Sequence, residues 1–412
     1  MEVTITPGRL SGTITPPPSK SQAHRLIIAA ALAGGESVVS NVAFSQDILA
    51  TLSCMEQLGA KWEQLDSSTI RVTGITGPKS GELPRFDCGE SGSTLRFLIP
   101  IALAVAGGGV FTGHGRLMER PQKPYFDLFE EKGIDYELKD GVLTVRGALT
   151  AGEYALAGNV SSQFFTGLLY ALPLLSGDST IRATTALESR SYIDMTLDAL
   201  HGCGIAATEE AGEFPVFRVP GGQAYQATDR AVEADWSQAG FWYAALGMGN
   251  DVTITGMNPD SVQGDRETAA FYELLSRPGD AVLDVADCPD LVPPMAALAA
   301  LRGVGNTTGI VNAQRLRIKE SDRLATVTQV LTALGADMEE LPDGLVLYGR
   351  DSLPGGVTVS AHNDHRIAMM AAVAATKCEA PVTITGAECV RKSYPNFWDD
   401  YKALGGKTEV RP

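Results

Sequence analysis

Apolar residues recur along the chain in a helix, turn and strand pattern that is repeated six times. The six amphipathic helices with their strands read ILATLSCMEQLGAKWEQL, YFDLFEEKGIDYEL, YIDMTLDALHGCGIAAT, ETAAFYELLSRPGDAVLDV, RLATVTQVLTALGADMEEL and FWDDYKALGGKTEV. Their turn glycines are spaced by 74, 71, 75, 56 and 70 residues and are Gly59, Gly133, Gly204, Gly279, Gly335 and Gly405. We expect each glycine at the helix C′ position, with the fourth copy, where Pro278 precedes Gly279, as the weakest.

Each copy also carries an earlier helix that is rich in alanine and leucine. These helices end in glycine or a small polar turn and lead into a β-branched strand, as in AAALAGGESVVSN and YAALGMGNDVTITG. The pentapeptide VTITG occurs twice, starting at residues 252 and 382. Six copies of a unit with two helices and several strands predict an α/β protein built by repetition, in which the units are too long for a solenoid.

The first of these helices, HRLIIAAALA at residues 24–33, is apolar nearly all round. It should therefore be buried, with only its N-terminus at an edge or cleft. Ser19 can cap it, and Lys20, Ser21 and Arg25 add to the positive end of the helix dipole, which favours a bound phosphate or carboxylate. A capped helix with solvated charges is the plainer interpretation of this segment alone.

The loops that open the six early helices are nearly all polar. They read PSKSQAHR, GESGSTLR, GNVSSQFF, ADWSQAG, CPDLVPP and AHNDHR, and the helices behind them are apolar. If the six copies are equivalent, these helix N-termini face a common cleft. A ring of helix N-termini around one cleft predicts a binding site for a polyanionic ligand.

Composition limits the classes of function. The 412 residues suffice for two or three domains, and 44% hydrophobic with 7% aromatic residues is typical of a soluble globular protein. The net charge of −16 argues against general binding of nucleic acid or anionic membranes, because most of the surface would repel phosphate. An anionic ligand must therefore bind at a local basic cluster.

The six cysteines are scattered, without a C-x-x-C pair or zinc-finger spacing. We expect reduced thiols and no metal site. The N-terminus, MEVTITPGRL, lacks the features of a leader, and no uncharged apolar run reaches the roughly 18 residues of a membrane span. These observations favour a cytoplasmic protein.

Nine short motifs in order carry a resemblance to a known family. PSKSQAHR, GESGSTLR, MERP, SSQF, SYIDMTL, PD at 289–290, RIKESDR, NDHR and RKSYP resemble the 5-enolpyruvylshikimate-3-phosphate synthases over essentially the whole chain. Taken singly, RIKESDR could be a solvated helix face, NDHR a turn, and GESGSTLR and SSQF helix caps. The resemblance rests on all nine together.

The resemblance implies an α/β fold of two similar domains, each of three βαβαββ repeats in an inside-out α/β barrel, with the active site in the cleft between them. One domain would comprise residues 1–18 and 230–412, and the other residues 19–229. The implied reaction transfers the enolpyruvyl group of phosphoenolpyruvate to the 5-hydroxyl of shikimate 3-phosphate and releases phosphate. This is a step of aromatic amino acid and chorismate biosynthesis, and glyphosate inhibits it.

The resemblance also assigns residues to the two substrates. Those implied for phosphoenolpyruvate are Lys20, Gly92, Arg120, Gln163, Lys319, Arg323, Arg366 and Lys392. Those implied for shikimate 3-phosphate are Lys20, Ser21, Arg25, Ser161, Ser162, Gln163, Ser189, Tyr192, Asp290 and Lys319. Guanidinium and ammonium groups suit a phosphate and a carboxylate, and hydroxyls with an amide suit a phosphorylated polyol.

The implied chemistry is an addition followed by an elimination. Glu320 is the candidate that moves the proton at C3 of phosphoenolpyruvate, and Asp290 and Lys20 are candidates for handling the attacking hydroxyl and the leaving phosphate. No metal or organic cofactor is implied, and the expected partners are the two small substrates, with no nucleic acid, no membrane and a monomeric chain.

Two rival functions and three departures stay open at this point. A UDP-N-acetylglucosamine enolpyruvyl transferase would carry a cysteine five residues before its Arg-Pro pair, where this chain has Gly115. A non-catalytic protein that binds phosphorylated metabolites is the second rival. Arg315, Glu90 and Phe97 stand where some or many relatives have Asn, Asn and Pro, so glyphosate sensitivity and substrate affinity do not follow from the resemblance.

Overall fold

The protein is described by a computed structural model that covers the chain except residues 77–81, 211 and 412. The chain forms two compact units. Unit 1 comprises Met1–Ser19 and Ala234–Pro412, and unit 2 comprises Lys20–Glu233. The chain therefore enters unit 2 directly after Ser19 and returns to unit 1 at Ala234.

Unit 2 contains three four-stranded sheets, with strand orders β14-β3-β5-β4, β6-β7-β9-β8 and β10-β11-β13-β12. Their strands are β3 (Glu36–Ser40), β4 (Lys61–Gln64), β5 (Ile70–Thr73), β6 (Arg85–Asp87), β7 (Gly108–Thr112), β8 (Asp135–Lys139), β9 (Val142–Arg146), β10 (Glu153–Leu156), β11 (Ser179–Ala183), β12 (Thr208–Glu210), β13 (Val216–Val219) and β14 (Arg230–Ala231). The helices are α1 (Lys20–Leu32), α2 (Gln46–Gln57), α3 (Gly92–Ala106), α4 (Lys123–Lys132), α5 (Ser162–Ala171) and α6 (Arg190–Gly202), with short turns η1 (Leu117–Glu119) and η2 (Leu172–Leu174).

Unit 1 contains two four-stranded sheets, β21-β23-β1-β24 and β16-β17-β19-β18, and the two-stranded sheets β15-β2 and β20-β22. Their strands are β1 (Glu2–Thr6), β2 (Ser11–Ile14), β15 (Asp251–Ile254), β16 (Ala281–Asp284), β17 (Thr307–Val311), β18 (Asp337–Leu341), β19 (Gly344–Tyr348), β20 (Leu353–Gly355), β21 (Thr358–Ser360), β22 (Cys378–Ala380), β23 (Val382–Thr385) and β24 (Lys407–Arg411). The helices are α7 (Trp236–Gly247), α8 (Thr268–Leu275), α9 (Val292–Ala300), α10 (Arg323–Leu334), α11 (His365–Ala375) and α12 (Phe397–Ala403), with turns η3 (Gly264–Glu267), η4 (Pro289–Leu291), η5 (Gln314–Ile318) and η6 (Ala387–Lys392).

The four-stranded sheets share one topology. In the sheet of β6 to β9, the first pair β6 and β7 is parallel, and β9 joins β7 and β8 by antiparallel pairing. The sheets that start at β10 and β16 have the same arrangement, and in each of them the four strands are consecutive in the sequence. The fold class is therefore α/β, and each of these three sheets has a helix between its parallel strands and ends in a hairpin.

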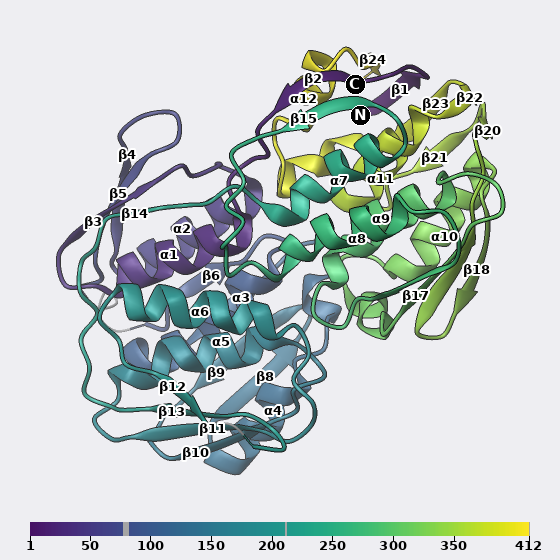
Figure 1. Cartoon of the computed structure of the whole chain (residues 1–412). Helices are drawn as coiled ribbons and strands as arrows, with labels where there is room; N and C mark the ends of the chain where they lie inside the picture. Colours follow the sequence, from purple (N-terminus) through teal and green to yellow (C-terminus); the bar gives the residue numbers. More distant parts are fainter. Residues whose placement is uncertain (77–81, 211, 412) are drawn as a thin grey trace. The chain divides into compact units, whose positions relative to one another are not determined.

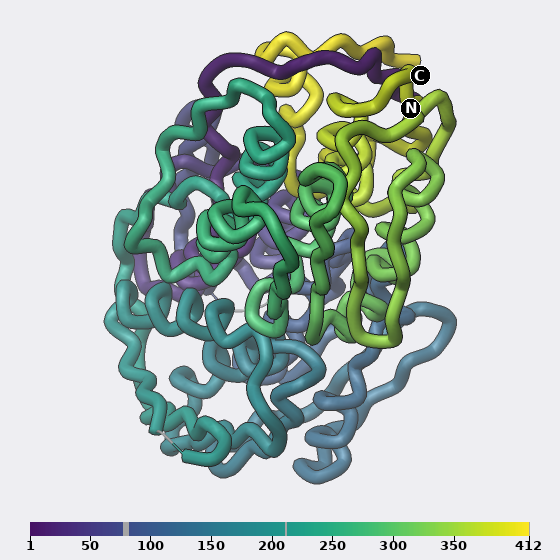
Figure 2. Tube along the Cα trace, turned by 45° about the vertical axis from the view of Figure 1, so that its right-hand side comes forward, coloured from purple at the N-terminus to yellow at the C-terminus, as the bar shows by residue number. Residues whose placement is uncertain are grey.

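Three sheets join segments that are distant in sequence, and one of them is the pairing of β2 with β15 in unit 1. Strand β14 pairs with β3, so the segment that leaves unit 2 completes the first sheet of that unit. In unit 1, β1 pairs with both β23 and β24, which places the first and last strands of the chain side by side (Figures 1 and 2). The chain ends thus stabilise the same sheet.

Each unit has its own core, centred on the early helices that the sequence predicts to be apolar. In unit 2, α1 is buried from Gln22 to Leu32, and α3 packs against α1 and α5. In unit 1, α7, α9 and α11 pack against one another (Figure 1). Separate clusters of buried apolar side chains surround the two helix sets. The prediction of a buried first helix, accessible only at its N-terminal residues, is confirmed.

The six turn glycines all have positive φ, which suits glycine. Gly133 and Gly335 cap α4 and α10 directly in the left-handed conformation. The prediction was wrong for Gly279, because α8 already ends at Leu275 and three residues, Ser276, Arg277 and Pro278, separate the helix from this glycine. The strand that follows, β16, pairs with β17 of the next sheet, so the fourth copy has no hairpin of its own in the described chain.

Candidate functional site

The N-termini of the early helices carry most of the predicted site residues in unit 2. Lys20 is the first residue of α1, Ser91 caps α3 ahead of Gly92, and Ser161 caps α5 by accepting from the backbone N–H of Gln163 at 3.3 Å. Helix N-termini present unpaired N–H groups and a partial positive charge. Unit 2 therefore offers several favourable positions for anionic groups of a ligand.

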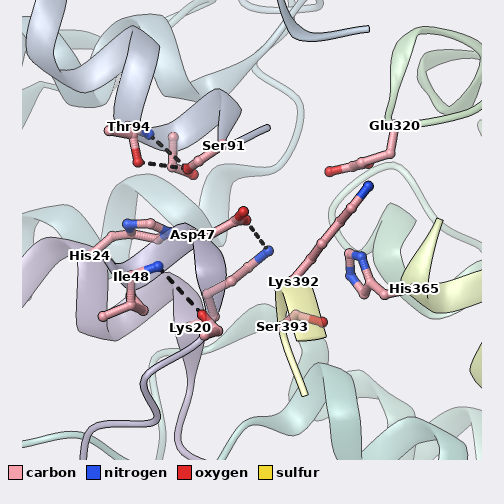
Figure 3. A network of polar contacts seen from close by, with 12 residues as sticks. Lys20, His24, Asp47, Ile48, Ser91, Thr94, Glu320, His365, Lys392 and Ser393 are labelled. Carbon is pink, nitrogen blue, oxygen red and sulfur yellow. Dashed lines mark hydrogen bonds and ion pairs between the residues drawn. The ribbon is translucent and has the colours of Figure 1, made fainter. Parts of the chain in front are cut away.

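Lys20 forms an ion pair with Asp47, a residue outside the nine motifs. Its Nζ donates to Asp47 Oδ2 at 2.8 Å, and Asp47 lies in the first turn of α2 (Figure 3). Both side chains are largely buried. The ion pair fixes the ammonium group of Lys20 at the start of α1, where it can contact an anion without a large loss of side-chain entropy.

A chain of short hydrogen bonds behind Lys20 connects three helices of unit 2. His24 Nδ1 lies 2.7 Å from Thr51 Oγ1, which lies 2.7 Å from Thr94 Oγ1. Thr94 in turn donates to Ser91 Oγ at 2.7 Å (Figure 3). Burial, together with Lys20 and Arg25, lowers the pKa of His24 well below its usual value. His24 is therefore a neutral structural residue that ties α1 to the Gly92 loop.

Arg25 lies inside unit 2, with about 1% of its surface exposed. Its Nε donates to Thr196 Oγ1 at 2.9 Å, its Nη1 to the Ser21 carbonyl at 2.7 Å, and its Nη2 to the Tyr192 carbonyl at 2.8 Å. A longer bond of 3.5 Å joins Nη2 to Thr166 Oγ1. Arg25 thus connects Ser21 and Tyr192, two other residues predicted for shikimate 3-phosphate.

Gln163 and Arg120 are positioned by neighbours from other helices. Gln163 Oε1 accepts from Arg96 Nη1 at 2.7 Å, and its Nε2 donates to Ser93 Oγ at 3.0 Å, so the amide links α5 to α3. Arg120 follows η1, and its guanidinium lies directly over Gly92. A Cβ atom at Gly92 would lie only 2.9 Å from Arg120 Nη1. The absence of a side chain at residue 92 makes room for this guanidinium.

Ser162, Ser189 and Tyr192 complete the predicted residues of unit 2. Ser162 is the first residue of α5 and is buried, and Ser189 precedes α6 with a left-handed φ of 54°. A positive φ is uncommon for a residue other than glycine and often occurs at functional sites. The structure brings Tyr192, Arg25 and Ser21 together through the bonds of Arg25.

In unit 1, four of the predicted residues join Arg323 in one network of charges, namely Asp290, Lys319, Glu320 and Arg366. Its Nε donates to Asp364 Oδ2 at 2.8 Å, its Nη1 to Asp290 Oδ1 at 2.8 Å, and its Nη2 to Glu320 Oε2 at 2.7 Å. Asp364 is fully buried at the N-cap of α11. Although burial opposes its charge, the three carboxylates raise the pKa of Arg323 above its usual value.

Asp290 is the second centre of this network. Besides Arg323, it accepts from Arg366 Nη2 at 3.0 Å and lies 3.5 Å from Lys319 Nζ. Burial favours its neutral form, but Arg366, Lys319 and Arg323 outweigh burial and hold the pKa of Asp290 well below its usual value. Asp290 is therefore a carboxylate surrounded by three cations.

Lys319, Glu320 and Lys392 occupy turns and not a solvated helix face. Lys319 and Glu320 lie between η5 and α10, and Asp322 caps α10. Burial lowers the pKa of Lys319. Lys392, labelled with Glu320 in Figure 3, is the last residue of η6 and donates to the Asn363 carbonyl at 2.7 Å. The motif RIKESDR thus forms part of a buried network.

Sequence reasoning did not identify Asp265, a buried carboxyl group on η3. Burial and the nearby Asp290 raise its pKa to about 7, although Arg366 acts in the opposite direction. Asp47 and Asp364 were also missed as functional partners. The sequence places Asp47 near the start of a predicted helix and Asp364 in the motif NDHR. Neither position reveals which cation the carboxylate pairs with in the folded chain.

The raised pKa of Asp265 predicts a specific pH dependence of stability. Because the folded chain keeps this proton at pH values where the unfolded chain has lost it, the carboxyl group destabilises the fold as pH rises from about 4 to about 7. We expect the free energy of unfolding of Asp265→Asn to rise relative to that of the parent protein over this range, by at most ~1.4 kcal/mol per pH unit.

Urea unfolding at pH 4.5, 6 and 7.5 measures this difference. The opposite contribution of His24 is common to both proteins and cancels in the comparison. Asp260→Asn, at an exposed neighbouring carboxylate, serves as the control. A constant difference between Asp265→Asn and the parent at all three pH values would contradict the prediction.

The three departures have distinct environments. Phe97 is buried in α3, with the guanidinium of Arg25 over its ring at 5.2 Å. Arg315 is also buried, and its Nη2 donates to the Ala286 carbonyl at 2.6 Å. Glu90 is partly buried in the loop before α3. Phe97 thus lies against Arg25, a residue predicted for shikimate 3-phosphate.

Metal-binding clusters, membrane-spanning helices and disulfides were not predicted from the sequence. Within the described ranges, His, Cys, Asp and Glu side chains form no cluster of three suited to a metal ion. Among the helices of the described chain, none has the length and apolarity that crossing a membrane requires. All six cysteines are free and buried.

Comparisons with known proteins agree on one family. The model of the family "EPSP synthase (3-phosphoshikimate 1-carboxyvinyltransferase)" matches residues 5–401. The 3-phosphoshikimate 1-carboxyvinyltransferase of Clostridium beijerinckii is 44% identical, over 98% of this chain and 97% of the relative. That of Clostridium acetobutylicum is 45% identical, over 98% of this chain and 97% of the relative.

Solved structures show the same fold at lower identity. An EPSP synthase of Acinetobacter baumannii superimposes with a TM-score of 0.81 and 24% identity, over the full length of both chains. The enolpyruvyl transferase NikO of Streptomyces tendae gives a TM-score of 0.77 and 17% identity, over 99% of this chain and 98% of NikO. Because the family model spans nearly the whole chain and full-length relatives exceed 40% identity, this chain belongs to the EPSP synthase (3-phosphoshikimate 1-carboxyvinyltransferase) family.

Proposed function

We propose that this chain is a transferase that moves the enolpyruvyl group of phosphoenolpyruvate to the 5-hydroxyl of shikimate 3-phosphate and releases phosphate. The observation that carries the proposal is the cationic network of Lys319, Arg323 and Arg366 around Asp290, in a chain whose net charge is −16. Cations concentrated and fixed in an acidic protein favour a small ligand with several negative charges. The full-length relatives named above support the choice of substrates.

Phosphoenolpyruvate would bind to residues of both units. Lys319, Arg366 and Lys392 of unit 1, and Lys20, Arg120, Gln163 and the N-terminus of α3 at Gly92 in unit 2, suit its phosphate and carboxylate. Arg323 would join them by exchanging a partner, because its three nitrogens are engaged with carboxylates. A substrate carboxylate that replaces Glu320 on Nη2 would release Glu320 for proton transfer.

Shikimate 3-phosphate would bind mainly to unit 2. Ser161 and Ser162 at the start of α5 offer hydroxyls and backbone N–H groups to the phosphate. Gln163, Ser189, Tyr192, Ser21 and Lys20 would contact the ring and its substituents, with Asp290 and Lys319 contributed by unit 1. Among the described residues, one N–H of Arg25 Nη1 has no acceptor, since the four bonds of this side chain use the other four N–H groups.

The reaction needs a proton at C3, a nucleophile at C2 and control of negative charge. Glu320, protonated once it has left Arg323, would deliver its proton to C3 and later take one back from C3. The proton of the 5-hydroxyl would pass to Asp290 and leave with the phosphate, so that the tetrahedral adduct collapses to the vinyl ether and phosphate. Asp290, which is ionised, would accept the hydrogen bond of the 5-hydroxyl, and its basicity rises as its cations turn to the substrate. Lys20 would stabilise the phosphate as it leaves.

The two rival functions are not favoured. The UDP-N-acetylglucosamine transferases are expected to carry a cysteine where this chain has Gly115, and no cysteine lies between Cys88 and Cys203. A non-catalytic binding protein would have no need of a proton-moving group beside the cations, yet Glu320 is held 2.7 Å from Arg323.

An assay of phosphate release tests the proposed function. The purified chain is incubated with phosphoenolpyruvate alone, with shikimate 3-phosphate, and with UDP-N-acetylglucosamine. We expect phosphate only in the second mixture, in one-to-one ratio with the enolpyruvyl product. Release with UDP-N-acetylglucosamine would support the first rival, and no release in any mixture would support the second.

Substitution of Gly92 should weaken phosphoenolpyruvate binding selectively. Gly92→Ala places a methyl group against Arg120, whose flexible guanidinium must move away. Loss of one charge-assisted hydrogen bond, about 1.5 kcal/mol or more, corresponds to a rise of about tenfold in KM for phosphoenolpyruvate. KM for shikimate 3-phosphate should change little.

Steady-state kinetics measures both constants. Gly34→Ala is the matched control, because a Cβ atom there meets nothing within 4 Å. If Gly92→Ala and Gly34→Ala have the same KM for phosphoenolpyruvate, the guanidinium of Arg120 does not bind this substrate.

A further inference from the structure

Phe97, one of the three departures, lies against Arg25, which is predicted to bind shikimate 3-phosphate. Its side chain in α3 is fully buried, and the Arg25 guanidinium carbon lies 5.2 Å from the centre of its ring. The ring of Tyr192 lies 5.8 Å from the same carbon. Both distances are within the range of favourable cation–π interactions. Two aromatic rings from different helices therefore contact one buried cation.

The remaining contacts hold the guanidinium by hydrogen bonds at its edge. Thr196, Ser21, Tyr192 and, over a longer distance, Thr166 accept bonds from its three nitrogens. Hydrogen bonds tolerate some deviation from the plane of the donor, and an aromatic ring close to the cation adds an attraction that narrows the remaining range of orientations. Phe97 is itself held in place, since its ring packs 6.4 Å from that of Tyr170, whose hydroxyl donates to the Arg25 carbonyl at 3.0 Å.

We propose that Phe97 is a positioning residue that orients Arg25, so that the remaining N–H of Nη1 points to an anionic group of shikimate 3-phosphate. This inference rests on the proposed function, because it requires Arg25 to contact that substrate. Burial lowers the pKa of Arg25 to about 10, which leaves the guanidinium charged at neutral pH. The aromatic residue at position 97 thus aligns the guanidinium of Arg25 by a cation–π contact, which a proline at this position could not make.

The inference predicts a split between the two substrates. Phe97→Leu and Phe97→Met keep an apolar side chain in the core but remove the aromatic face. The contact is already present without substrate, so its strength sets the upper limit of its orienting effect, and we place the loss of affinity between about 5- and 30-fold. We therefore expect KM and Kd for shikimate 3-phosphate to rise in this range, while KM for phosphoenolpyruvate changes less than threefold.

Phe86→Leu is the matched control. Phe86 is equally buried in unit 2 and stacks on Phe111 at 4.8 Å, and it is not among the residues predicted to bind either substrate. This variant should lose stability as Phe97→Leu does, yet keep the parent KM values. Thermal unfolding and circular dichroism of all variants identify any that fails to fold, and the Leu and Met substitutions give two chances of a folded protein.

The outcomes separate the inference from the proposed function. If the parent protein releases phosphate with shikimate 3-phosphate but both Phe97 variants match Phe86→Leu in KM, Phe97 does not position Arg25. Equal increases in KM for both substrates would also overturn the inference, because they indicate a general disturbance of unit 2. A parent protein without activity on shikimate 3-phosphate would instead contradict the proposed function.

Discussion

Glu320→Gln is expected to lower kcat by roughly 10²–10⁴, the usual contribution of a positioned acid or base, with little change in the affinity for either substrate. The carboxylate accepts from Arg323 at 2.7 Å and is only partly exposed, so its position is fixed before substrate binds. The amide of glutamine keeps the shape and can still accept this hydrogen bond, but it cannot take up and return the proton at C3.

Single-turnover kinetics separates this effect from binding. Glu340→Gln is a suitable control, since Glu340 pairs with Arg317 at 2.8 Å in the same unit and lies outside the predicted site. That variant should turn over at the parent rate. A Glu320→Gln enzyme within tenfold of the parent would show that another group moves the proton.

Arg323→Met is expected to lower the free energy of unfolding by roughly 3–5 kcal/mol, in addition to abolishing turnover. The reason is the burial of its partners. Asp364 has no exposed surface, and its carboxylate accepts a hydrogen bond from Arg323 Nε at 2.8 Å. Removal of the cation therefore leaves a buried carboxylate without its main counter-charge. Asp290 loses one of three cations and Glu320 its guanidinium partner.

Urea unfolding of three proteins tests the explanation. Arg350→Met removes an exposed arginine that pairs with Asp337 at 3.0 Å in unit 1, and its stability should stay within experimental error of the parent. Arg323→Met combined with Asp364→Asn should recover part of the loss, because the second change removes the buried charge. An Arg323→Met protein as stable as Arg350→Met would mean that the network contributes nothing to the fold.

Much of the fold could be predicted from the sequence, since periodicity and turn glycines are local signals. The apolar helix after Lys20 and the positive φ of the six glycines follow from side-chain pattern and backbone sterics. The prediction for the fourth copy was wrong because α8 ends at Leu275, several residues before Pro278 and Gly279. Pairing of β14 with β3 and of β1 with β24 joins distant segments, which no local pattern reveals.

The candidate site was predictable in its residue types more than in its connections. The motif RIKESDR identified Lys319, Glu320 and Arg323, but a plain spacing argument would have paired them along a helix face. In the structure Arg323 reaches Asp290 and Asp364, which are 33 and 41 residues away along the chain. The aromatic partners of Arg25 were equally hidden, because contact between α1 and α3 depends on how unit 2 packs.

The most direct test of the central claim is mass spectrometry of the product formed in deuterated water from phosphoenolpyruvate and shikimate 3-phosphate. If the chain transfers the enolpyruvyl group by addition and elimination, the product is shikimate 3-phosphate carrying an enolpyruvyl ether at its 5-oxygen. Its vinyl group contains deuterium, because the transient methyl group rotates before it returns a hydrogen. A product without deuterium would contradict the mechanism, and unchanged shikimate 3-phosphate would contradict the function itself.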